Sequence, residues 1–350
     1  MATIPETIDD VTPAWLRDVA GLLCEPATVT QIGVGVGVSS ALYRVALEGG
    51  EGCPSSVIVK LPALDEAAVF TSTMLRMYIR EVAFFERLAA DVPVRVPAVH
   101  HAEVDAESSR FVVVMEDMGG LRIVDQLEGM AVQDAEVAVD ALAAWHATWW
   151  RDADHLAEEG VAVSLGDPVY PAVLPIVFAE GWEKVMSGMD VAPAMAAIGP
   201  RWTAAMPQLL QDLASQPATL CHGDYRADNI LFDEEGAPVL LDFQLTGTGS
   251  GAYDLAYFIT QSLEADVAEA HERALFDRYT DGLRAAGVPE DDLGDDLWLD
   301  YRKAALFCLV YPVVASRGMD LSDPRQLALL ECMNARFTRA AEQLALDELL

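Results

Sequence analysis

Two groups of polar side chains in the middle of the chain have the residue types and spacing of a divalent-metal site. His222-Gly223-Asp224 is followed by Asn229, and Asp242-Phe243-Gln244 comes directly after the apolar run Pro238-Val239-Leu240-Leu241. A carboxylate at the end of a buried strand is costly to desolvate unless something binds it. Carboxylate and amide oxygens are the ligands that Mg²⁺ prefers, and Mg²⁺ also binds substrate phosphates. We therefore expect Asn229 and Asp242 to hold Mg²⁺.

Phosphoryl transfer is a reaction that would use such a site. It needs one more carboxylate to orient the attacking hydroxyl, and Asp224 is the candidate. Because the hydroxyl loses its proton late, the positioning role of Asp224 can matter more than its basicity. For any one acid taken alone, the ordinary alternative is a buried turn in which the acid caps a helix or strand.

A hairpin would position these side chains. The apolar segments 229–232 and 239–241 are separated by Asp233-Glu234-Glu235-Gly236, which is a turn signal. The stretch from Thr219 to Tyr257 is predicted to run as strand, loop, strand, turn, strand, loop and helix. The hairpin would bring Asp224, Asn229 and Asp242 together.

The order of these residues carries a family resemblance. Aspartate, asparagine and then Asp-Phe is the order of the protein-kinase catalytic loop and metal aspartate. Here Gly223 precedes the first aspartate in place of arginine, and Gln244 replaces the glycine after Asp-Phe. HGDxxxxN, DFQ and the later DLAY resemble the aminoglycoside phosphotransferase superfamily, most closely its ecdysteroid-kinase-like (CHK-type) branch. The resemblance spans essentially the whole chain and implies an α+β, two-lobed protein-kinase-like fold.

A glycine-rich segment near the N-terminus, 33–40, stands between two predicted strands. The resemblance implies that Gly35, Gly37 and Ser40 cover the phosphates of ATP. A dinucleotide-binding loop is the alternative, but it needs a helix directly after the glycines, whereas a strand pattern follows here. An ordinary hairpin also stays open for this segment alone.

Lys60 directly follows the β-branched run 57–59, where a lysine is unexpected without an anionic partner. The resemblance makes it the lysine that contacts the α- and β-phosphates. Its partner is expected to be Glu81, which lies in an ExxFF pattern, rather than Glu86. The alternative is a lysine that protects an edge strand.

The lobes are expected to meet after the apolar strand 111–115. The resemblance implies an N-terminal lobe over 1–115, a hinge over 116–120 and a C-terminal lobe over 121–350. In that hinge, Glu116 and Met118 would present backbone groups to adenine.

His146 and Asp254 are expected to support the catalytic loop. The region 151–215 is expected to help form the acceptor pocket. The predicted helices are 4–23, 71–90, 134–150, 265–286, 296–317 and 324–348.

Composition excludes several classes of partner. The 350 residues carry a formal charge of -34, which argues against nucleic acid and anionic membranes. No apolar run approaches the roughly 20 residues of a membrane helix, and no secretory signal is visible. Five cysteines without a CxxC pair favour reduced thiols, a cytoplasmic location and no zinc site.

Taken together, the resemblance implies an ATP- and Mg²⁺-dependent phosphotransferase that moves the γ-phosphate to a hydroxyl of a small molecule. Aminoglycoside- or antibiotic-like, steroid-like and amino-alcohol acceptors are all compatible. A catalytically silent nucleotide-binding pseudokinase is the alternative. A metallohydrolase would need more histidine ligands than the six scattered histidines offer. The acceptor, the choice of ATP or GTP and the oligomeric state stay open.

Overall fold

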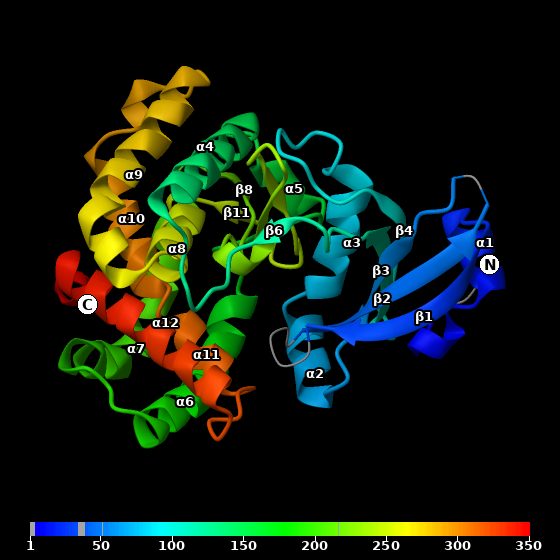
Figure 1. Ribbon diagram of the computed structural model, residues 1–350. Helices are drawn as coiled ribbons and strands as arrows, with labels where there is room; N and C mark the ends of the chain where they lie inside the picture. The colour runs from blue at the N-terminus through cyan, green and yellow to red at the C-terminus, as the bar shows by residue number, and fades with distance from the viewer. Residues whose placement is uncertain (1–3, 34–38, 51, 216) are drawn as a thin grey trace. The chain divides into compact units, whose positions relative to one another are not determined.

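The protein, described by a computed structural model over residues 4–33, 39–50, 52–215 and 217–350, forms two compact units. The first contains Met1–Asp91 and Val96–Leu121, and the second contains Val92–Arg95 and Arg122–Leu350 (Figure 1). The first is built on a sheet and the second is mainly helical, so the α+β class expected from the sequence is confirmed.

The first unit has a five-stranded antiparallel sheet in the order β1-β2-β3-β5-β4. Its central strands are rich in valine and buried on both faces, whereas β1 is an exposed edge. The strands are β1 (Cys24–Ile32), β2 (Ser40–Gly49), β3 (Ser56–Pro62), β4 (Val99–Asp105) and β5 (Arg110–Glu116).

The N-terminal helix of this unit, α1 (Pro13–Ala20), is shorter than the predicted 4–23. The Thr12 side chain caps it by accepting a hydrogen bond from the Trp15 N–H at 3.2 Å, and Gly21 ends it in the left-handed conformation. A short 3₁₀ helix, Ile8–Asp10, precedes it. Trp15 and Leu16 pack into the core under the sheet.

The single helix predicted over 71–90 is two helices, α2 (Glu66–Met74) and α3 (Met77–Arg87). The break falls at Leu75 and Arg76, and Arg76 has a φ of 55°. A non-glycine residue in this region cannot continue a right-handed helix. The prediction of one continuous helix was wrong because Arg76 carries no sequence signal for that conformation.

A disulfide joins Cys24 and Cys53, so the prediction that all five thiols are reduced is wrong for this pair. Cys24 begins β1 opposite Gly49 at the end of β2, which brings the following turn, with Cys53, back to it. Their Cα atoms are 5.9 Å apart, within the usual range for a disulfide. Cys221, Cys308 and Cys332 are free thiols.

The second unit contains two small sheets among helices. Its strands are β6 (Arg122–Ile123), β7 (Val163–Ser164), β8 (Thr219–Cys221), β9 (Ile230–Phe232), β10 (Pro238–Leu240) and β11 (Gly247–Gly249). Their orders are β10-β9-β6 and β7-β11-β8. The predicted hairpin is confirmed, with β9 and β10 antiparallel and Leu231 opposite Val239.

The α-helices of the second unit are α4 (Val132–Thr148), α5 (Asp154–Glu158), α6 (Val169–Gly188), α7 (Pro193–Ser215), α8 (Ala252–Ser262), α9 (Ala265–Ala285), α10 (Asp295–Phe307), α11 (Val310–Ser316) and α12 (Pro324–Gln343). Short 3₁₀ helices cover Ala227–Asn229, Glu290–Asp292 and Leu346–Leu349. The helix predicted over 296–317 is interrupted between α10 and α11, because Pro312 cannot donate to the carbonyl of Cys308.

The centre of the second unit is α8, of which every residue is buried. It packs against α9, α10 and α12 (Figure 1). This helix begins directly after β11 and carries Asp254 in its first turn. Within the described ranges, no helix has the length and apolar character that crossing a bilayer requires.

Candidate active site

The loop after β8 needs glycine at position 223. Gly223 has a φ of 85°, and a Cβ there would lie 2.0 Å from the carbonyl oxygen of Leu245. Any side chain would therefore push this loop away from the segment after Asp242. Protein kinases have arginine at this position. Here glycine is required, because the two segments pack backbone to backbone.

Asp224 and Asn229 lie next to each other in this loop. The Asn229 side-chain amide donates to the Asp224 carbonyl oxygen at 2.9 Å and to the Asp224 Oδ2 at 2.8 Å. Both side chains are buried, with 8% and 6% of the residue surface exposed. This use of Nδ2 leaves the Asn229 Oδ1 as the atom available to a metal ion.

Asp242 follows β10 and is tied to the same loop through backbone atoms. The Leu241 N–H donates to the Asn229 carbonyl at 2.9 Å, and the His222 ring donates through Nε2 to the Leu241 carbonyl at 3.0 Å. Asp242 has a φ of 65°, a conformation that costs free energy for a non-glycine residue. Its Oδ2 accepts a hydrogen bond from the Gln244 amide at 3.2 Å.

Arg226 is a site residue that the sequence reasoning missed. Its Nε is 3.2 Å from the Asp224 Oδ1, and its Nη1 donates to the Asp228 Oδ2. The signal in the sequence was a cation placed between two acids at alternate positions of HGDYRADN. Tyr257 was missed as well, although its phenol hydrogen-bonds Asp224 from the buried helix α8.

Asp254, in the first turn of α8, accepts two hydrogen bonds from the loop that carries Asp224. Its partners are the His222 N–H at 2.6 Å and the Gly223 N–H at 2.9 Å. The His146 Nε2 lies 3.1 Å from Asp254, and the His146 Nδ1 lies 2.7 Å from the Tyr279 hydroxyl. With Nε2–H donating to Asp254, Nδ1 accepts from Tyr279. The supporting roles expected for His146 and Asp254 are confirmed by these contacts.

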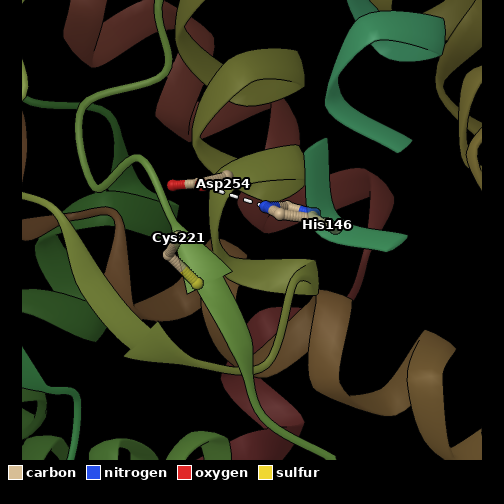
Figure 2. Close-up of side chains that lie close together, drawn as sticks. All are labelled: His146, Cys221 and Asp254. Carbon is tan, nitrogen blue, oxygen red and sulfur yellow. Dashed lines mark hydrogen bonds and ion pairs between the residues drawn. The ribbon is translucent and has the colours of Figure 1, made fainter. Parts of the chain in front are cut away.

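His146, Cys221 and Asp254 also bring three potential metal-ligand atoms within 4.8 Å of one another (Figure 2). Burial raises the pKa of the Cys221 thiol well above its ordinary value, and the nearby Asp254 raises it further. A neutral thiol is a poor metal ligand. Because the Asp254 oxygens already accept three hydrogen bonds, the group acts as a buried support for the loop.

His222 is buried in the same region, in tilted contact with two aromatic rings. Its ring centroid is 6.0 Å from that of Trp145 and 5.3 Å from that of Phe243. Burial lowers the pKa of His222, although Asp254, Asp224 and Asp242 oppose this shift. A neutral ring fits its observed contacts, with one nitrogen donating to Leu241 and the other accepting from the Asp224 N–H.

In the first unit, Lys60 and Glu81 form a buried ion pair. The Lys60 Nζ lies 2.7 Å from the Glu81 Oε1, and the two residues are 3% and 1% exposed. Glu86 is exposed, so the preference for Glu81 as the partner is confirmed. Because β3 lies between β2 and β5, the alternative of a lysine that protects an edge strand is wrong.

Other predicted nucleotide contacts lie in the same unit. The Ser40 Oγ is buried and has no hydrogen-bond partner among the described residues. Gly35 and Gly37 lie outside the described residues. The Glu116 carboxylate accepts the Ala98 N–H at 3.2 Å, and the buried Met118 accepts the Leu121 N–H through its carbonyl. The strand β2 begins at Ser40, so the helix that a dinucleotide-binding loop needs is not at this position.

A cavity of about 720 Å³ lies elsewhere in the second unit. It is lined by the segment 189–192, by Glu269 of α9 and by one face of α12. The segment 189–192 belongs to the region 151–215 that was expected to help form the acceptor pocket. Asp224, Asn229 and Asp242 are not among the residues that line the cavity.

The chain is similar to a known protein family and to solved structures. The family model described as "Phosphotransferase enzyme family" matches residues 30–288, which is more than half of the chain. No curated protein matches the sequence.

Solved structures share the fold. Choline kinase from Cryptosporidium parvum Iowa II has 12% identity and a TM-score of 0.55, over 92% of this chain and 91% of that one. The GDP complex of aminoglycoside 2'-phosphotransferase-IIIa has 17% identity and a TM-score of 0.54, over 89% and 93%. Plasmodium vivax ethanolamine kinase has 12% identity and a TM-score of 0.51, over 92% and 84%. The expected protein-kinase-like fold is thereby confirmed.

Proposed function

Because the chain belongs to the phosphotransferase enzyme family, we propose that it transfers the γ-phosphoryl group of ATP to a hydroxyl of a small molecule, with Mg²⁺. The observation that carries the proposal is the junction of the two motifs, in which Asn229 bonds Asp224 through its side chain and Leu241 through its backbone. The resemblance to the aminoglycoside phosphotransferase superfamily is confirmed by the family match. The closer likeness to the ecdysteroid-kinase-like branch stays a prediction.

The second unit would supply the acceptor side of the reaction. Asp224 would accept the hydrogen bond of the attacking hydroxyl and hold that oxygen in line with the γ-phosphorus. The Asn229 Oδ1 and the Asp242 carboxylate would hold Mg²⁺, which suits the oxygen ligands that this ion prefers. The ion supplies positive charge that neutralises the phosphate oxygens. Asp254 would keep the loop in shape through its bonds to His222 and Gly223.

The first unit would supply the nucleotide contacts. Lys60, held by Glu81, would contact the α- and β-phosphates. The unpaired Ser40 hydroxyl, with Gly35 and Gly37, would cover the phosphates. The backbone of the predicted hinge 116–120, at Glu116 and Met118, would bind adenine. We retain the predicted lobe boundaries, 1–115 and 121–350, as part of the proposal.

An amine-bearing alcohol is the acceptor class that we favour within the wider range of small alcohols. The choline kinase, the ethanolamine kinase and the aminoglycoside phosphotransferase with a similar fold are all named for substrates that carry nitrogen. The charge of -34 would attract a cationic acceptor over long range. Antibiotic-like and steroid-like alcohols belong in the same screen.

The test is an ADP-release screen over choline, ethanolamine, kanamycin and a sterol, run with and without Mg²⁺. We expect turnover with at least one acceptor only when Mg²⁺ is present. The Asp224→Ala variant should lose about a thousandfold in turnover, which is the scale of a general base. Asp140→Ala, which removes an exposed acid of α4 paired with Arg278, is the matched control and should keep wild-type turnover.

Two results would count against the proposal. Near-normal turnover of Asp224→Ala on an identified acceptor would remove the assigned role of this carboxylate. ATP binding by the wild type without transfer to any acceptor would instead favour the nucleotide-binding pseudokinase.

A further inference from the structure

One face of α12 forms a wall of the cavity of about 720 Å³ in the second unit. The residues of this wall recur at intervals of three and four along the helix, which places them on one face. The lining also includes Glu269 of α9 and the segment 189–192 between α6 and α7 (Figure 1). The cavity has the size of a small-molecule site. The wall on α12 contains Glu331, Asn334, Ala335, Thr338, Arg339 and Glu342.

Arg339 carries an unused hydrogen-bonding edge. Its Nη1 donates to the Glu272 Oε2 at 2.7 Å and to the Gln343 Oε1 at 3.0 Å. Its Nε and Nη2 have no partner among the described residues, although only 10% of the side chain is exposed. Leaving buried donors of a cation unpaired costs free energy. An acceptor group of a ligand would therefore be stabilised at this edge.

The shape of this edge selects a carboxylate. The Nε and Nη2 of an arginine point in the same direction and can bond both oxygens of a carboxylate. The chain uses the edge in this way elsewhere, since Arg44 holds Asp117 through Nε at 2.7 Å and Nη2 at 3.1 Å, and Arg278 holds Asp140 at 2.7 and 2.6 Å. Among the described residues no carboxylate takes this place on Arg339. A carboxylate of a ligand is the group that fits it.

Asn334 needs a group of the opposite kind. Its Nδ2 donates to the Leu330 carbonyl at 2.7 Å and contacts the Met189 Sδ at 3.3 Å. Its Oδ1 accepts no hydrogen bond from the described residues, and only 5% of the residue is exposed. An ammonium group has three N–H donors. The carboxylates of Asp190 and Glu331 line the same cavity and would attract such a group.

The two unpaired side chains lie close together on α12. A long helical side chain covers the turn that precedes its own Cα, and for Arg339 this turn contains Ala335, the neighbour of Asn334. The unpaired atoms are shielded from bulk water, but Gln343, which bonds Arg339, has an exposed side chain. Exposed side chains change rotamer within nanoseconds. A ligand in the cavity gains access to the shielded edge through such movements.

We propose that this cavity binds an amino acid, whose carboxylate pairs with the Nε and Nη2 of Arg339 and whose ammonium group pairs with the Oδ1 of Asn334 and the nearby carboxylates. An amino acid carries both groups on one carbon, as two adjacent subsites require. Part of the wall is apolar and favours an apolar side chain on the ligand. The site shares no residue with the loop that carries Asp224. The apolar part consists of Met189, Val191, Ala192 and Ala335.

The test is calorimetric titration of the full chain with L-leucine, L-methionine and L-phenylalanine, without nucleotide. We expect saturable binding of at least one of them, with a dissociation constant below about 1 mM. For the amino acid that binds, the amine without the carboxylate and the acid without the amino group isolate the two charges. For leucine these are 3-methylbutylamine and 4-methylpentanoate. Each should bind at least about tenfold more weakly than the amino acid, because it leaves one subsite unpaired.

Two variants locate the bound amino acid. Arg339→Gln removes the carboxylate-binding edge and should weaken binding about 10- to 100-fold, the scale of charge-assisted hydrogen bonds. Because it also leaves the buried Glu272 without its cation, thermal melting must show that this variant is folded. Ala335→Phe keeps that ion pair, fills the cavity from an exposed position of α12 and should abolish binding. Ala274→Phe, at an exposed position of α9 outside the cavity, is the matched control and should bind like wild type.

Three results would overturn the proposal. The absence of saturable binding by all three amino acids would show that the cavity is not an amino-acid site. An amine that binds as tightly as its parent amino acid would leave the Arg339 edge without a ligand. Binding retained in Ala335→Phe would place the amino acid elsewhere on the protein. The titration uses neither ATP nor an acceptor alcohol, so its outcome and that of the phosphotransfer assay are independent.

Discussion

The backbone N–H of Leu241 donates to the carbonyl oxygen of Asn229 at 2.9 Å. This bond joins the residue before Asp242 to the last residue of the Asp224 loop. The two motifs, separated in the sequence by a hairpin, are therefore parts of one hydrogen-bonded structure. A change in either motif acts on the other through the backbone as well as through any shared ligand.

Asp242→Asn tests the metal site without disturbing the backbone. Asparagine tolerates the positive φ of position 242 better than most residues, so we expect the free energy of unfolding to change by less than about 1 kcal/mol. The lost carboxylate should weaken Mg²⁺ binding and lower turnover by about a hundredfold or more. A Mg²⁺ titration of turnover checks this. Unchanged Mg²⁺ dependence would exclude Asp242 as a ligand.

Asp254→Ala tests the support of the loop. It leaves the buried His222 and Gly223 N–H groups and the His146 ring without their acceptor. Each unpaired group costs about 1–3 kcal/mol, and we expect a total loss of about 3–5 kcal/mol in urea unfolding. Asp140→Ala on the surface is the control, with an expected loss below about 1 kcal/mol. Equal losses for the two variants would contradict this role.

The Cys24–Cys53 disulfide should stabilise the first unit. It closes a loop with a sequence separation of 29 residues. The chain-entropy relation gives about 3–4 kcal/mol for a loop of this size. Dithiothreitol should therefore lower the urea midpoint of the wild type but not that of the double variant Cys24→Ser/Cys53→Ser. Cys332→Ser should behave like the wild type, since Cys332 is outside the disulfide. A reductant effect that persists in the double variant would have another source.

Asp300 should make stability depend on pH. Burial raises its pKa from 3.8 to about 7, and Asp296 and Asp212 add to this while Lys303 and the Ser250 hydroxyl oppose it. The folded state then keeps a proton that the unfolded state loses, so stability falls as the pH rises from about 4 to about 7. The full shift corresponds to about 4 kcal/mol.

Asp300→Asn removes this titration. We expect the difference in unfolding free energy between pH 4.5 and pH 8 to shrink by most of that amount in the variant, as measured by urea unfolding at both pH values. A variant with the pH dependence of the wild type would show that Asp300 is already ionised in the folded protein at pH 4.5.

Features that depend on short stretches of the chain could be predicted from the sequence. The loop residues Asp224 and Asn229 and the hairpin after them follow from short-range spacing and strand periodicity, whereas the partnership of Lys60 with Glu81 follows from the family resemblance. The catalytic and metal roles assigned to these residues remain predictions that the variants above test.

Other features depend on contacts that spacing does not encode. The disulfide arises from the register of β1 and β2, and the break between α2 and α3 arises from the φ of Arg76. The contacts of Arg226 required the folded loop, because an arginine among acids usually indicates only a solvated surface. Pro312, in contrast, was visible in the sequence and accounts for the interruption between α10 and α11.

The burial of α8 has a consequence for how the protein loses activity. All eleven residues of this helix are shielded from water, and its first turn carries the acceptor for two amides of the loop that contains Asp224. Amide hydrogens of α8 should exchange with deuterium only through global opening of the second unit. The loop should keep its shape on heating until that unit melts as a whole, so inactivation and melting should coincide without a folded but inactive stage.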